Sequence, residues 1–461
     1  MTLIASVSGI RGTIGGEINQ NLTPVDVVAF AAAYGSWIKT KHQLATVVVG
    51  RDARISGPMV QALVQQTLVS LGINVIDVGL STTPTVEMEV VRKQAQGGII
   101  ITASHNPKQW NALKLLNNKG EFISAEDGFE LMQYVNDQSF EFVGVDELGK
   151  ISVVTDALTA HMDAILSLPL VNVAAIKAAR FSAVVDGVNS SGGVAVPMLL
   201  EQLGVKVNKI HCTPNGAFPH NPEPLKEHLV DLSDAVTEEH ADLGIAVDPD
   251  VDRLVFIDEN GLLFGEEYTL VACADYVLQT DKGAIVSNLS SSRALADLGN
   301  DYGVDYHTSA VGEVHVVAKM KEVNAVIGGE GNGGVILPVL HYGRDALVGI
   351  ALFLSHLAKE KISVSTLKER YASYVMDKKK IELSPSWDAD ALLVAVAKTF
   401  ANERVTTIDG VKIDFDDSWI HLRKSNTEPI IRLYGEAKTQ EKMADKINTI
   451  EAAIAAFVAS T

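Results

Sequence analysis

The chain has 461 residues, 47% of them hydrophobic and 21% charged, which is ordinary for a folded globular protein of about three or four domains. Its formal net charge of −19 argues against nucleic acid or an anionic membrane as the main partner, because both require a basic surface. No apolar run approaches the roughly 18 residues of a membrane span, no signal peptide is evident and the cysteines form no C-x-x-C motif, so we expect a cytoplasmic protein.

The first third of the chain alternates segments typical of helices with segments typical of buried strands. Thr23 can cap a first helix, Pro24 suits its first position, and Asp26 favours the positive end of the helix dipole. Such alternation predicts α/β layers in which much of the sheet is buried. Helices are expected at 23–39, 58–71 and 84–95, and strands at 45–50, 73–79 and 97–102.

The same alternation restarts near residue 181 and again near residue 266, and the second restart closes with a long helix over 344–361. After residue 371 the pattern changes to one helix, short strands and a terminal helix, which predicts a smaller α+β domain. We therefore expect an α/β fold of three related α/β domains with mixed sheets and a C-terminal α+β domain, divided as 1–152, 153–256, 257–370 and 371–461.

The sequence DPDVDR carries the most distinctive local pattern, with Asp248, Asp250 and Asp252 at alternate positions. Carboxylates this close repel one another unless a cation binds them, and their oxygens suit Mg²⁺. A calcium-binding EF-hand loop is rejected, because its sixth position requires glycine and is Arg253 here. The apolar strands on either side place the loop at a sheet edge, where sites form. A solvated acidic turn is the alternative.

The sequence RKSNTEP suits a phosphate group. A guanidinium fork matches phosphate oxygens, and hydroxyl, amide and backbone N–H groups complete such a cradle. A polar turn without a ligand is the alternative. The residues in question are Arg423, Ser425, Asn426 and Thr427, with Arg432 beyond them.

The sequence GGEGNGG, at residues 328–334, is rich enough in glycine for the backbone to approach a ligand closely. Glu330 and Asn332 are its only side chains able to bind hydroxyls or an amine. A flexible hairpin turn is the alternative.

Ser104, in the sequence TASHNP, follows a predicted buried strand and is a candidate nucleophile. His105 is adjacent, but neighbours along an extended chain point to opposite faces, so the two form no ready-made nucleophile–base pair. Phosphoryl transfer needs cations and positioning more than covalent machinery. Basic residues that could supply these, although each alone is typical of a surface charge, are Arg11, Arg51, Arg54 and Lys114.

Taken in order, these motifs resemble the α-D-phosphohexomutases. SGIRG lies near the start, followed by TASHNP as a phosphoserine loop, DPDVDR as a metal loop, GGEGNGG as a sugar loop and RKSNTEP as a phosphate loop. The resemblance covers nearly the whole chain and implies four domains around a central cleft. Three positions depart from the family pattern: Pro249 replaces a glycine, Asn332 replaces a serine, and GRDAL near Arg344 differs from the usual D-G pair.

By this resemblance Ser104 would be the phosphorylated nucleophile, and its phosphate would share Mg²⁺ with the three aspartates. Arg253 would steady the phosphoserine, and Arg11 would contact the transferring phosphoryl group. His105 and Lys114 would line the reacting oxygens, with Lys114 the better general acid or base. Glu330 and Asn332 would grip the sugar. The non-reacting phosphate would be held by Arg423, Ser425, Asn426, Thr427 and Arg432.

The resemblance implies a phosphoryl transfer between C6 and C1 of a sugar, through a sugar 1,6-bisphosphate that acts as intermediate and activator. We therefore expect a small sugar phosphate as the partner, and a monomer or homodimer that binds neither nucleic acid nor membrane. SGIRGTIGG, GGEGNGG and NLSSSRAL are most similar to the phosphoglucosamine mutase branch, which implies conversion of glucosamine 6-phosphate to glucosamine 1-phosphate. Phosphoglucomutase or phosphomannomutase activity is the runner-up. A metal-dependent sugar phosphatase and a non-catalytic sugar-phosphate-binding protein are the rivals from other classes.

Overall fold

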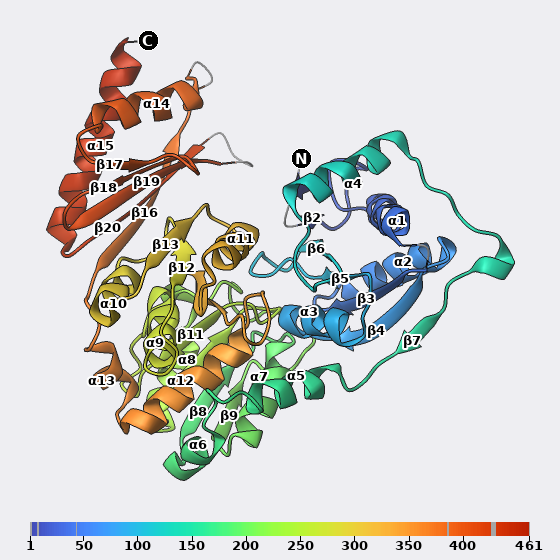
Figure 1. The fold of residues 1–461 in the computed structure, drawn as a ribbon, viewed down its shortest axis with the longest axis horizontal. Coiled ribbons are helices and arrows are strands. Elements are labelled where there is room, and N and C mark those ends of the chain that lie inside the picture. The colour runs from blue at the N-terminus through green and yellow to red at the C-terminus, as the bar shows by residue number, and fades with distance from the viewer. Residues whose placement is uncertain (1, 7–8, 43, 385–386, 426–429, 461) are drawn as a thin grey trace.

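The structure of the chain is a computed structural model that describes residues 2–6, 9–42, 44–384, 387–425 and 430–460. The described strands form four sheets, and we call the parts that carry them domains I to IV in chain order. Figure 1 shows domain I in blue to teal, domain II in green, domain III in yellow to orange and domain IV in deep orange to red. Domains I and IV stand apart from each other, and domains II and III join them.

Domain I is built on a mixed sheet whose parallel strands β5, β3 and β4 lie at the centre. Strand β6 runs antiparallel to β5 and leads to the antiparallel pair β2 and β1 at one edge. Parallel neighbours need crossover helices, which is why helices and strands alternate here. The order is β1-β2-β6-β5-β3-β4-β7, with β1 Ile4–Ser6, β2 Gly9–Thr13, β3 Thr46–Arg51, β4 Asn74–Leu80, β5 Gly97–Ile101, β6 Trp110–Leu116, β7 Ile151–Val153, α1 Pro24–Lys41, α2 Gly57–Ser70, α3 Thr83–Arg92 and α4 Ala125–Asp137.

Domains II and III repeat a smaller version of this plan, each with parallel strands and one antiparallel edge strand. Domain II has the order β11-β10-β8-β9, with β8 Ser182–Asp186, β9 Lys206–Ile210, β10 Leu243–Val247, β11 Leu254–Ile257, α5 Ala157–Leu166, α6 Val173–Ala179, α7 Gly192–Gln202 and α8 Val230–Glu238. Domain III has the order β13-β12-β14-β15, with β12 Ile285–Asn288, β13 Tyr306–Ser309, β14 Ile327–Glu330, β15 Gly334–Ile336, α9 Glu266–Leu278, α10 Ala294–Tyr302, α11 Glu313–Val323, α12 Ala346–Glu360 and α13 Val364–Lys368.

Domain IV has a wholly antiparallel sheet among its described strands, with two helices packed against it. Its order is β16-β20-β19-β18-β17, with β16 Val375–Glu382, β17 Arg404–Thr406, β18 Val411–Asp414, β19 Ser418–Lys424, β20 Ile430–Ala437, α14 Ala389–Thr399 and α15 Gln440–Ser460. The mixed α/β sheets and the smaller α+β domain confirm the predicted fold class. The residue boundaries proposed between the domains stay a prediction.

Local capping explains where two of the predicted helices begin. Thr23 caps α1 in a capping box with Asp26, as its position before Pro24 predicts. The long helix predicted from residue 344 begins at Ala346 instead, because the Asp345 carboxylate accepts hydrogen bonds from Leu347 N and Val348 N. Arg344 is thereby left outside the helix.

One continuous hydrophobic core serves domains II and III, whereas domains I and IV have cores of their own. At its centre Phe256 of β11 stacks on Phe353 of α12 with ring centroids 3.8 Å apart, and Phe264 packs edge-on against both. Nearly every residue of α9 and α12 is buried, as expected for helices that are apolar on all sides.

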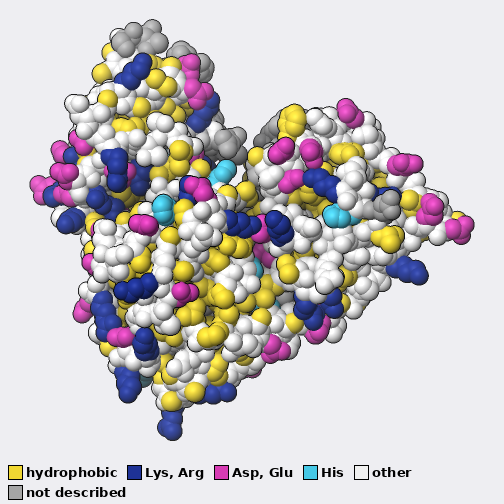
Figure 2. Space-filling view, viewed as in Figure 1, with side chains coloured by type: hydrophobic (Ala, Val, Ile, Leu, Met, Phe, Trp, Pro, Cys, Tyr) yellow, Lys and Arg dark blue, Asp and Glu magenta, His cyan; other side chains and the backbone are white. Residues whose placement is uncertain are grey.

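A hollow separates the parts of the molecule that carry domains I and IV, and Lys, Arg and His side chains border it (Figure 2). Domain IV is fastened to the domain III side of this hollow: Ser290 Oγ lies 2.9 Å from His421 Nδ1, and Glu436 Oε1 accepts from Arg293 N at 2.9 Å. Within the described part of the chain no helix is both long and apolar enough to cross a membrane.

Removal of the Phe353 ring tests the shared core. We expect Phe353→Ala to lower the free energy of unfolding of the joint domain II–III unit by about 3–5 kcal/mol, because it leaves a cavity where the ring stacks on Phe256. Phe129→Ala is the matched control, since that ring is 69% exposed on α4 and its removal should cost less than about 0.5 kcal/mol. If urea-unfolding curves show equal losses of unfolding free energy for Phe353→Ala and Phe129→Ala, the shared core is contradicted.

Candidate active site

Ser104 lies at the carboxyl end of β5 in a tight turn rather than in extended backbone. Its φ of 48° is left-handed, which is uncommon for a residue other than glycine and marks a position held by its surroundings. The Ser104 hydroxyl donates to Asp248 Oδ2 at 2.6 Å, across the boundary between domains I and II. The expectation that Ser104 and His105 point apart is wrong, because the turn brings Ser104 Oγ to 3.4 Å from His105 Nδ1.

Arg54 holds the loop that carries Ser104. It is 1% exposed, and its Nε donates to Asp52 Oδ2 at 3.0 Å. Its remaining guanidinium N–H groups donate to backbone carbonyls, so all five donors are occupied. The sequence predicts that Arg54 could supply a cation to phosphoryl oxygens. In the structure Arg54 instead fixes the shape of the loop. The accepting carbonyls are those of Ser104 at 2.5 Å, Asn106 at 2.7 Å, and Pro107 and Trp110 at 2.9 Å each.

The three aspartates of the DPDVDR loop follow β10 and are fully buried. Each offers a carboxylate oxygen, and these oxygens lie within 4.8 Å of one another. The loop is strained at Val251, whose φ of 66° is a genuine outlier for a β-branched residue. Oδ1 of Asp250 and Oδ1 of Asp252 are buried without a hydrogen-bond partner in the described part of the chain. Clustered, unpartnered carboxylate oxygens fit an oxygen-liganded divalent cation.

Two cations from other domains compensate this loop. Lys114 Nζ lies 2.6 Å from Asp250 Oδ2 and 2.9 Å from Asp252 Oδ2, and Arg344 Nη2 lies 2.7 Å from Asp252 Oδ2. Burial and the neighbouring carboxylates of Asp252 and Asp250 raise the pKa of Asp248 well above its usual range. Burial would also raise the pKa of Asp252, but Arg344 and Lys114 lower it by more. The loop therefore contains one carboxyl group that retains its proton readily, that of Asp248, and one that is firmly ionised, that of Asp252.

Lys114 and His105 differ in protonation. Burial lowers the pKa of the Lys114 ammonium, but Asp250 and Asp252 more than offset this, so its pKa is raised and it stays charged. Burial, helped by the nearby Arg253 guanidinium, lowers the pKa of His105 well below 6.5. At neutral pH His105 is thus a neutral imidazole able to accept a proton, whereas Lys114 can only donate one.

Arg11 and Arg253 bring positive charge to the neighbourhood of His105, the residue that follows Ser104. Burial and the Arg253 guanidinium lower the pKa of Arg11. Arg253 Nη1 is paired with Glu223 Oε1 at 3.2 Å, while its buried Nε has no hydrogen-bond partner among the described residues. An anion between these two guanidinium groups would relieve the repulsion that Arg253 exerts on Arg11.

Arg344 joins the metal loop to the sugar loop, and sequence reasoning noted it only as a departure from the family pattern. Its Nη1 lies 2.9 Å from Glu330 Oε2, its Nε lies 2.9 Å from Glu313 Oε2, and its Nη2 reaches Asp252. Glu330 is 4% exposed and also accepts from Asn288 Nδ2 at 2.8 Å. Three buried carboxylates therefore share one guanidinium. Asn332 is turned toward its own loop, where its Oδ1 accepts from Gly334 N at 3.2 Å.

The predicted phosphate loop lies in domain IV, at the turn from β19 to β20. Arg423 and Arg432 are directly paired across these antiparallel strands, an arrangement that is unfavourable for like charges unless an anion or carboxylate compensates them. Arg423 Nε pairs with Asp409 Oδ2 at 2.8 Å, and Asp409 in turn accepts from Val311 N of domain III at 2.9 Å. Ser425 closes the turn by donating its N–H to the Ile430 carbonyl at 3.0 Å. Asn426 and Thr427 lie outside the described residues.

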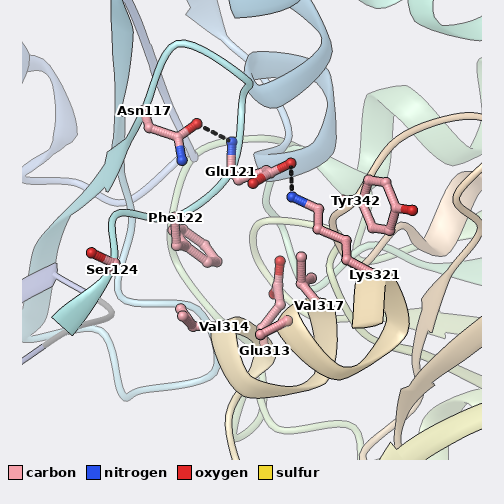
Figure 3. Close-up of a pocket in the computed structure, with 10 residues that line it drawn as sticks. Asn117, Glu121, Phe122, Ser124, Glu313, Val314, Val317, Lys321 and Tyr342 are labelled. Carbon is pink, nitrogen blue, oxygen red and sulfur yellow. Dashed lines mark hydrogen bonds and ion pairs between the residues drawn. The ribbon is translucent and has the colours of Figure 1, made fainter. Parts of the chain in front are cut away.

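A small cavity of about 190 Å³ lies where domain I meets α11 of domain III (Figure 3). Glu121 and Lys321 pair across it at 2.5 Å, beside Phe122 and Tyr342. Neither Ser104 nor the aspartate triplet is among the described residues that line this cavity, so we treat it as a domain contact.

Comparison with protein families matches nearly the whole chain. Models of phosphoglucomutase/phosphomannomutase alpha/beta/alpha domains I, II and III match residues 3–142, 159–261 and 265–374, and the model of the C-terminal domain matches 374–453.

Curated relatives cover similar lengths. A phosphoglucomutase/phosphomannomutase of Thermococcus kodakarensis is 36% identical over 94% of this chain and 95% of its own. A probable phosphoglucosamine mutase of Methanopyrus kandleri is 32% identical over 94% of each chain. A phosphoglucosamine/phosphogalactosamine mutase of Sulfurisphaera tokodaii is 30% identical over 98% of this chain and 99% of its own.

A solved structure shares the whole architecture. The crystal structure of a phosphoglucomutase/phosphomannomutase family protein from Burkholderia thailandensis superposes with a TM-score of 0.85, at 25% identity, over 98% of each chain. The fold, the four matched domains and the curated relatives agree with one another. The chain therefore belongs to the phosphoglucomutase/phosphomannomutase family of α-D-phosphohexomutases and is an enzyme that isomerises sugar phosphates.

Proposed function

We propose that this phosphohexomutase interconverts glucosamine 6-phosphate and glucosamine 1-phosphate. Phospho-Ser104 gives its phosphoryl group to the O1 hydroxyl of the 6-phosphate, forming the 1,6-bisphosphate and breaking the bond to Ser104 Oγ. The bisphosphate turns over in the site, and Ser104 Oγ takes the phosphoryl group from O6. The enzyme is thereby restored to its phosphorylated form, and the 1-phosphate leaves.

The hydrogen bond of 2.6 Å between Ser104 Oγ and Asp248 Oδ2 is the observation that carries this proposal. A phosphate on Ser104 would lie against the three carboxylates, and a bound cation would stabilise this added negative charge beyond what Lys114 and Arg344 compensate. Asp248, Asp250 and Asp252 would hold Mg²⁺ together with that phosphate, because their oxygens are the ligands that Mg²⁺ prefers. When bound, Mg²⁺ would supply positive charge to the phosphoryl oxygens during transfer.

His105 and Lys114 are the groups that would handle protons. His105, neutral because of burial and Arg253, would accept the proton of the attacking sugar hydroxyl. Lys114 retains its proton, so we assign it a cationic role toward phosphoryl oxygens and reserve donation for the step in which Ser104 Oγ leaves.

Two pairs of arginines fit a substrate that carries a phosphate at each end. Arg11 and Arg253 would receive the reacting phosphoryl group beside Ser104. Arg423 and Arg432, with Ser425, would hold the other phosphate from domain IV. Because this second phosphate site is separate from Ser104, Arg423 and Arg432 could hold either phosphate of the bisphosphate while the other phosphate reacts.

The choice of an amino sugar rests on charge. Glu313 and Glu330 pair with the guanidinium of Arg344, which Asp252 shares although Lys114 also contacts Asp252. Burial raises the pKa of Glu313 despite its contact with Arg344. An ammonium at C2 of the sugar would add the positive charge that these carboxylates lack. The names of the Methanopyrus and Sulfurisphaera relatives support the same substrate class.

Phosphoglucomutase or phosphomannomutase activity is the second candidate. The Thermococcus relative, at 36% identity, carries that name, and Glu330 already accepts a hydrogen bond from Asn288 and a charge-assisted one from Arg344. With these two hydrogen-bond donors, the Glu330 carboxylate could orient a neutral sugar hydroxyl and would not require an ammonium group on the substrate.

Removal of the Ser104 hydroxyl tests the phosphoserine mechanism. We expect intact-mass analysis to find one phosphate that maps to Ser104, and Ser104→Ala to lower kcat/KM by at least about 10³-fold because the nucleophile is lost. Ser139→Ala, at an exposed serine, is the control and should leave both measurements unchanged. Isomerisation by protein that never carries phosphate at Ser104, even after treatment with a sugar bisphosphate, would refute the mechanism.

Loss of one carboxylate tests the metal assignment. We expect Asp250→Asn to lower kcat/KM in Mg²⁺ by about 10²-fold or more and to weaken the Mg²⁺ dependence of the rate, because a ligand loses its charge. Asp281→Asn removes an exposed carboxylate and should have no effect. Wild-type activity of Asp250→Asn across a Mg²⁺ titration would show that the triplet does not hold the ion.

Substrate comparison tests the amino-sugar assignment. We expect kcat/KM to be at least about 10-fold higher for glucosamine 6-phosphate than for glucose 6-phosphate, mannose 6-phosphate or N-acetylglucosamine 6-phosphate. Glu330→Gln should lower this ratio, while Glu322→Gln, 65% exposed at its side chain, should not. Faster turnover of a neutral hexose phosphate would reject glucosamine in favour of the second candidate.

A further inference from the structure

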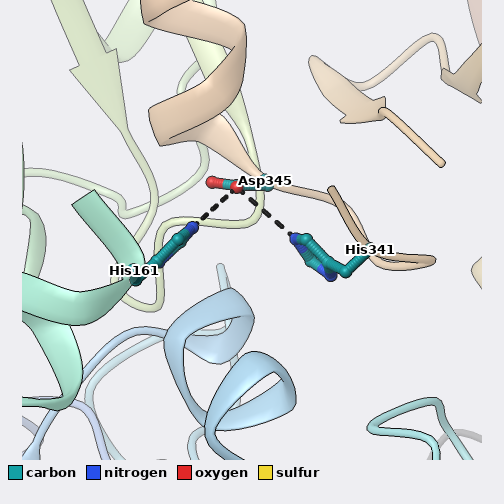
Figure 4. Close-up of side chains that lie close together, drawn as sticks. All are labelled: His161, His341 and Asp345. Carbon is teal, nitrogen blue, oxygen red and sulfur yellow. Dashed lines mark hydrogen bonds and ion pairs between the residues drawn. The ribbon is translucent and has the colours of Figure 1, made fainter. Parts of the chain in front are cut away.

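Two histidines and a carboxylate meet at the junction of domains I, II and III, apart from the proposed catalytic residues (Figure 4). His161 comes from α5 of domain II, and His341 and Asp345 come from the segment between β15 and α12 of domain III. His161 is 2% exposed and Asp345 is completely buried. Helix α3 of domain I packs beside them and contributes Thr85 and Glu87.

Both imidazole rings point their Nε2 atoms at the same carboxylate oxygen. His161 Nε2 lies 3.0 Å and His341 Nε2 lies 3.4 Å from Asp345 Oδ2, and the two rings are nearly perpendicular (Figure 4). A tetrahedral ion with bonds of about 2.0–2.1 Å separates neighbouring ligand atoms by about 3.3 Å. Two of the three separations are therefore close to the spacing that such an ion requires, and one ligand atom from each residue lies within 4.8 Å of the other two.

The opposite sides of His161 and Asp345 are already oriented by hydrogen bonds, and a carboxylate lies beside that of His341. His161 Nδ1 lies 2.9 Å from Thr85 Oγ1, whereas His341 Nδ1 lies 3.3 Å from Glu87 Oε2, an ion-pair contact without hydrogen-bond geometry. Asp345 Oδ1 accepts from Leu347 N at 2.8 Å at the start of α12. Metal-binding histidines commonly have such a partner on the second nitrogen, because it sets the tautomer and the direction of the ring.

Glu87 brings a second buried carboxylate to the junction, beside His341. Glu87 is 1% exposed, and neither of its carboxylate oxygens has a hydrogen-bond partner in the described part of the chain. A divalent cation held by the two imidazoles would place positive charge beside both buried carboxylates, Glu87 and Asp345.

The backbone next to these residues leaves room for Glu87. A side chain at Gly343 would place its Cβ 1.9 Å from Glu87 Oε2. A cavity of about 440 Å³, lined in part by His161, His341 and Arg92, reaches the cluster and provides an approach for an ion.

We propose that His161, His341 and Asp345 bind a divalent transition-metal ion of the zinc class, distinct from the ion of the aspartate triplet. Imidazole nitrogen ligands suit zinc and its neighbours, whereas Mg²⁺ prefers oxygen ligands alone. Three protein ligands leave a fourth position for water.

Such an ion would tie together the elements beneath the catalytic residues. Thr83 begins α3, and its hydroxyl donates to Asp250 Oδ2 at 2.5 Å, two residues before Thr85. Arg344 precedes Asp345 and binds Asp252 and Glu330. The ion would therefore hold α3, α5 and the start of α12 in one arrangement, and its role is structural.

The test uses the full chain, stripped with a chelator and then incubated with Zn²⁺ in excess Mg²⁺. After desalting, we expect one zinc ion per chain by plasma mass spectrometry, and zinc-edge X-ray absorption should show nitrogen and oxygen ligands at about 2.0–2.1 Å with imidazole scattering. His161→Gln and His341→Gln each remove a ligand and should weaken zinc binding by at least about 10-fold. Glu87→Gln leaves the three ligands in place but removes the carboxylate charge beside His341, and should weaken zinc binding by about 10–100-fold.

Two variants serve as controls for the other places where zinc could bind. Asp250→Asn removes a ligand of the catalytic triplet, and His220→Gln removes one histidine of the partly exposed group formed with Asp186 and His211. Both should retain the junction zinc. The proposal is overturned if wild-type protein retains no more zinc than His341→Gln, if either control loses the ion instead, or if absorption by the wild type shows only oxygen ligands.

Discussion

Asp248, Asp250 and Asp252 are buried together at the end of β10, and buried carboxylates are stable only when cations or hydrogen-bond donors surround them. Few of those partners come from domain II itself. Lys114 reaches the triplet from β6 of domain I, Arg344 reaches it from domain III, and the Ser104 hydroxyl donates to it from the end of β5. The charge of one short loop therefore requires three domains to meet at one place. A phosphoserine would add negative charge there, which is why the same place suits a divalent cation.

The position of Ser104 depends on a second buried charge. Arg54 places all of its guanidinium donors on Asp52 and on the carbonyls of the serine loop, so the left-handed turn at Ser104 is held from behind. Because Arg54 donates to backbone carbonyls, it does not contact the reacting groups. It instead restricts the movement of Ser104. The hydroxyl, the carboxylates and the neutral His105 are consequently oriented before any substrate binds, which is the condition for efficient transfer.

Helix α3 links the chemistry to the domain junction. Its first residue, Thr83, binds Asp250, while Thr85 and Glu87 face His161 and His341. Domains II and III share one hydrophobic core, in which nearly all of α9 and α12 is buried. Domain IV has its own core and is attached mainly by polar contacts such as that of Arg293 with Glu436. The molecule thus combines a tightly packed base with a separate domain that carries the proposed phosphate grip.

Much of the fold and of the candidate site could be predicted from the sequence, because the relevant signals are local. Helix and strand periodicity, capping residues such as Thr23, and the alternate spacing of the aspartates all depend on residues within a few positions of one another. The sequence therefore determined the fold class and the loops in which chemistry was expected. Even there, the sequence wrongly predicts that the side chains of Ser104 and His105 point apart, because a left-handed turn replaces the extended backbone assumed for these neighbours.

Only the tertiary structure decided what the buried charges do. Arg54 binds a carbonyl 50 residues away, Arg344 binds a carboxylate 92 residues away, and His161 meets Asp345 across 184 residues. No local pattern distinguishes these side chains from ordinary surface charges, because their roles depend on partners that arrive with other domains. Desolvation then makes each pairing obligatory, since a buried charge without a partner costs far more than an exposed one.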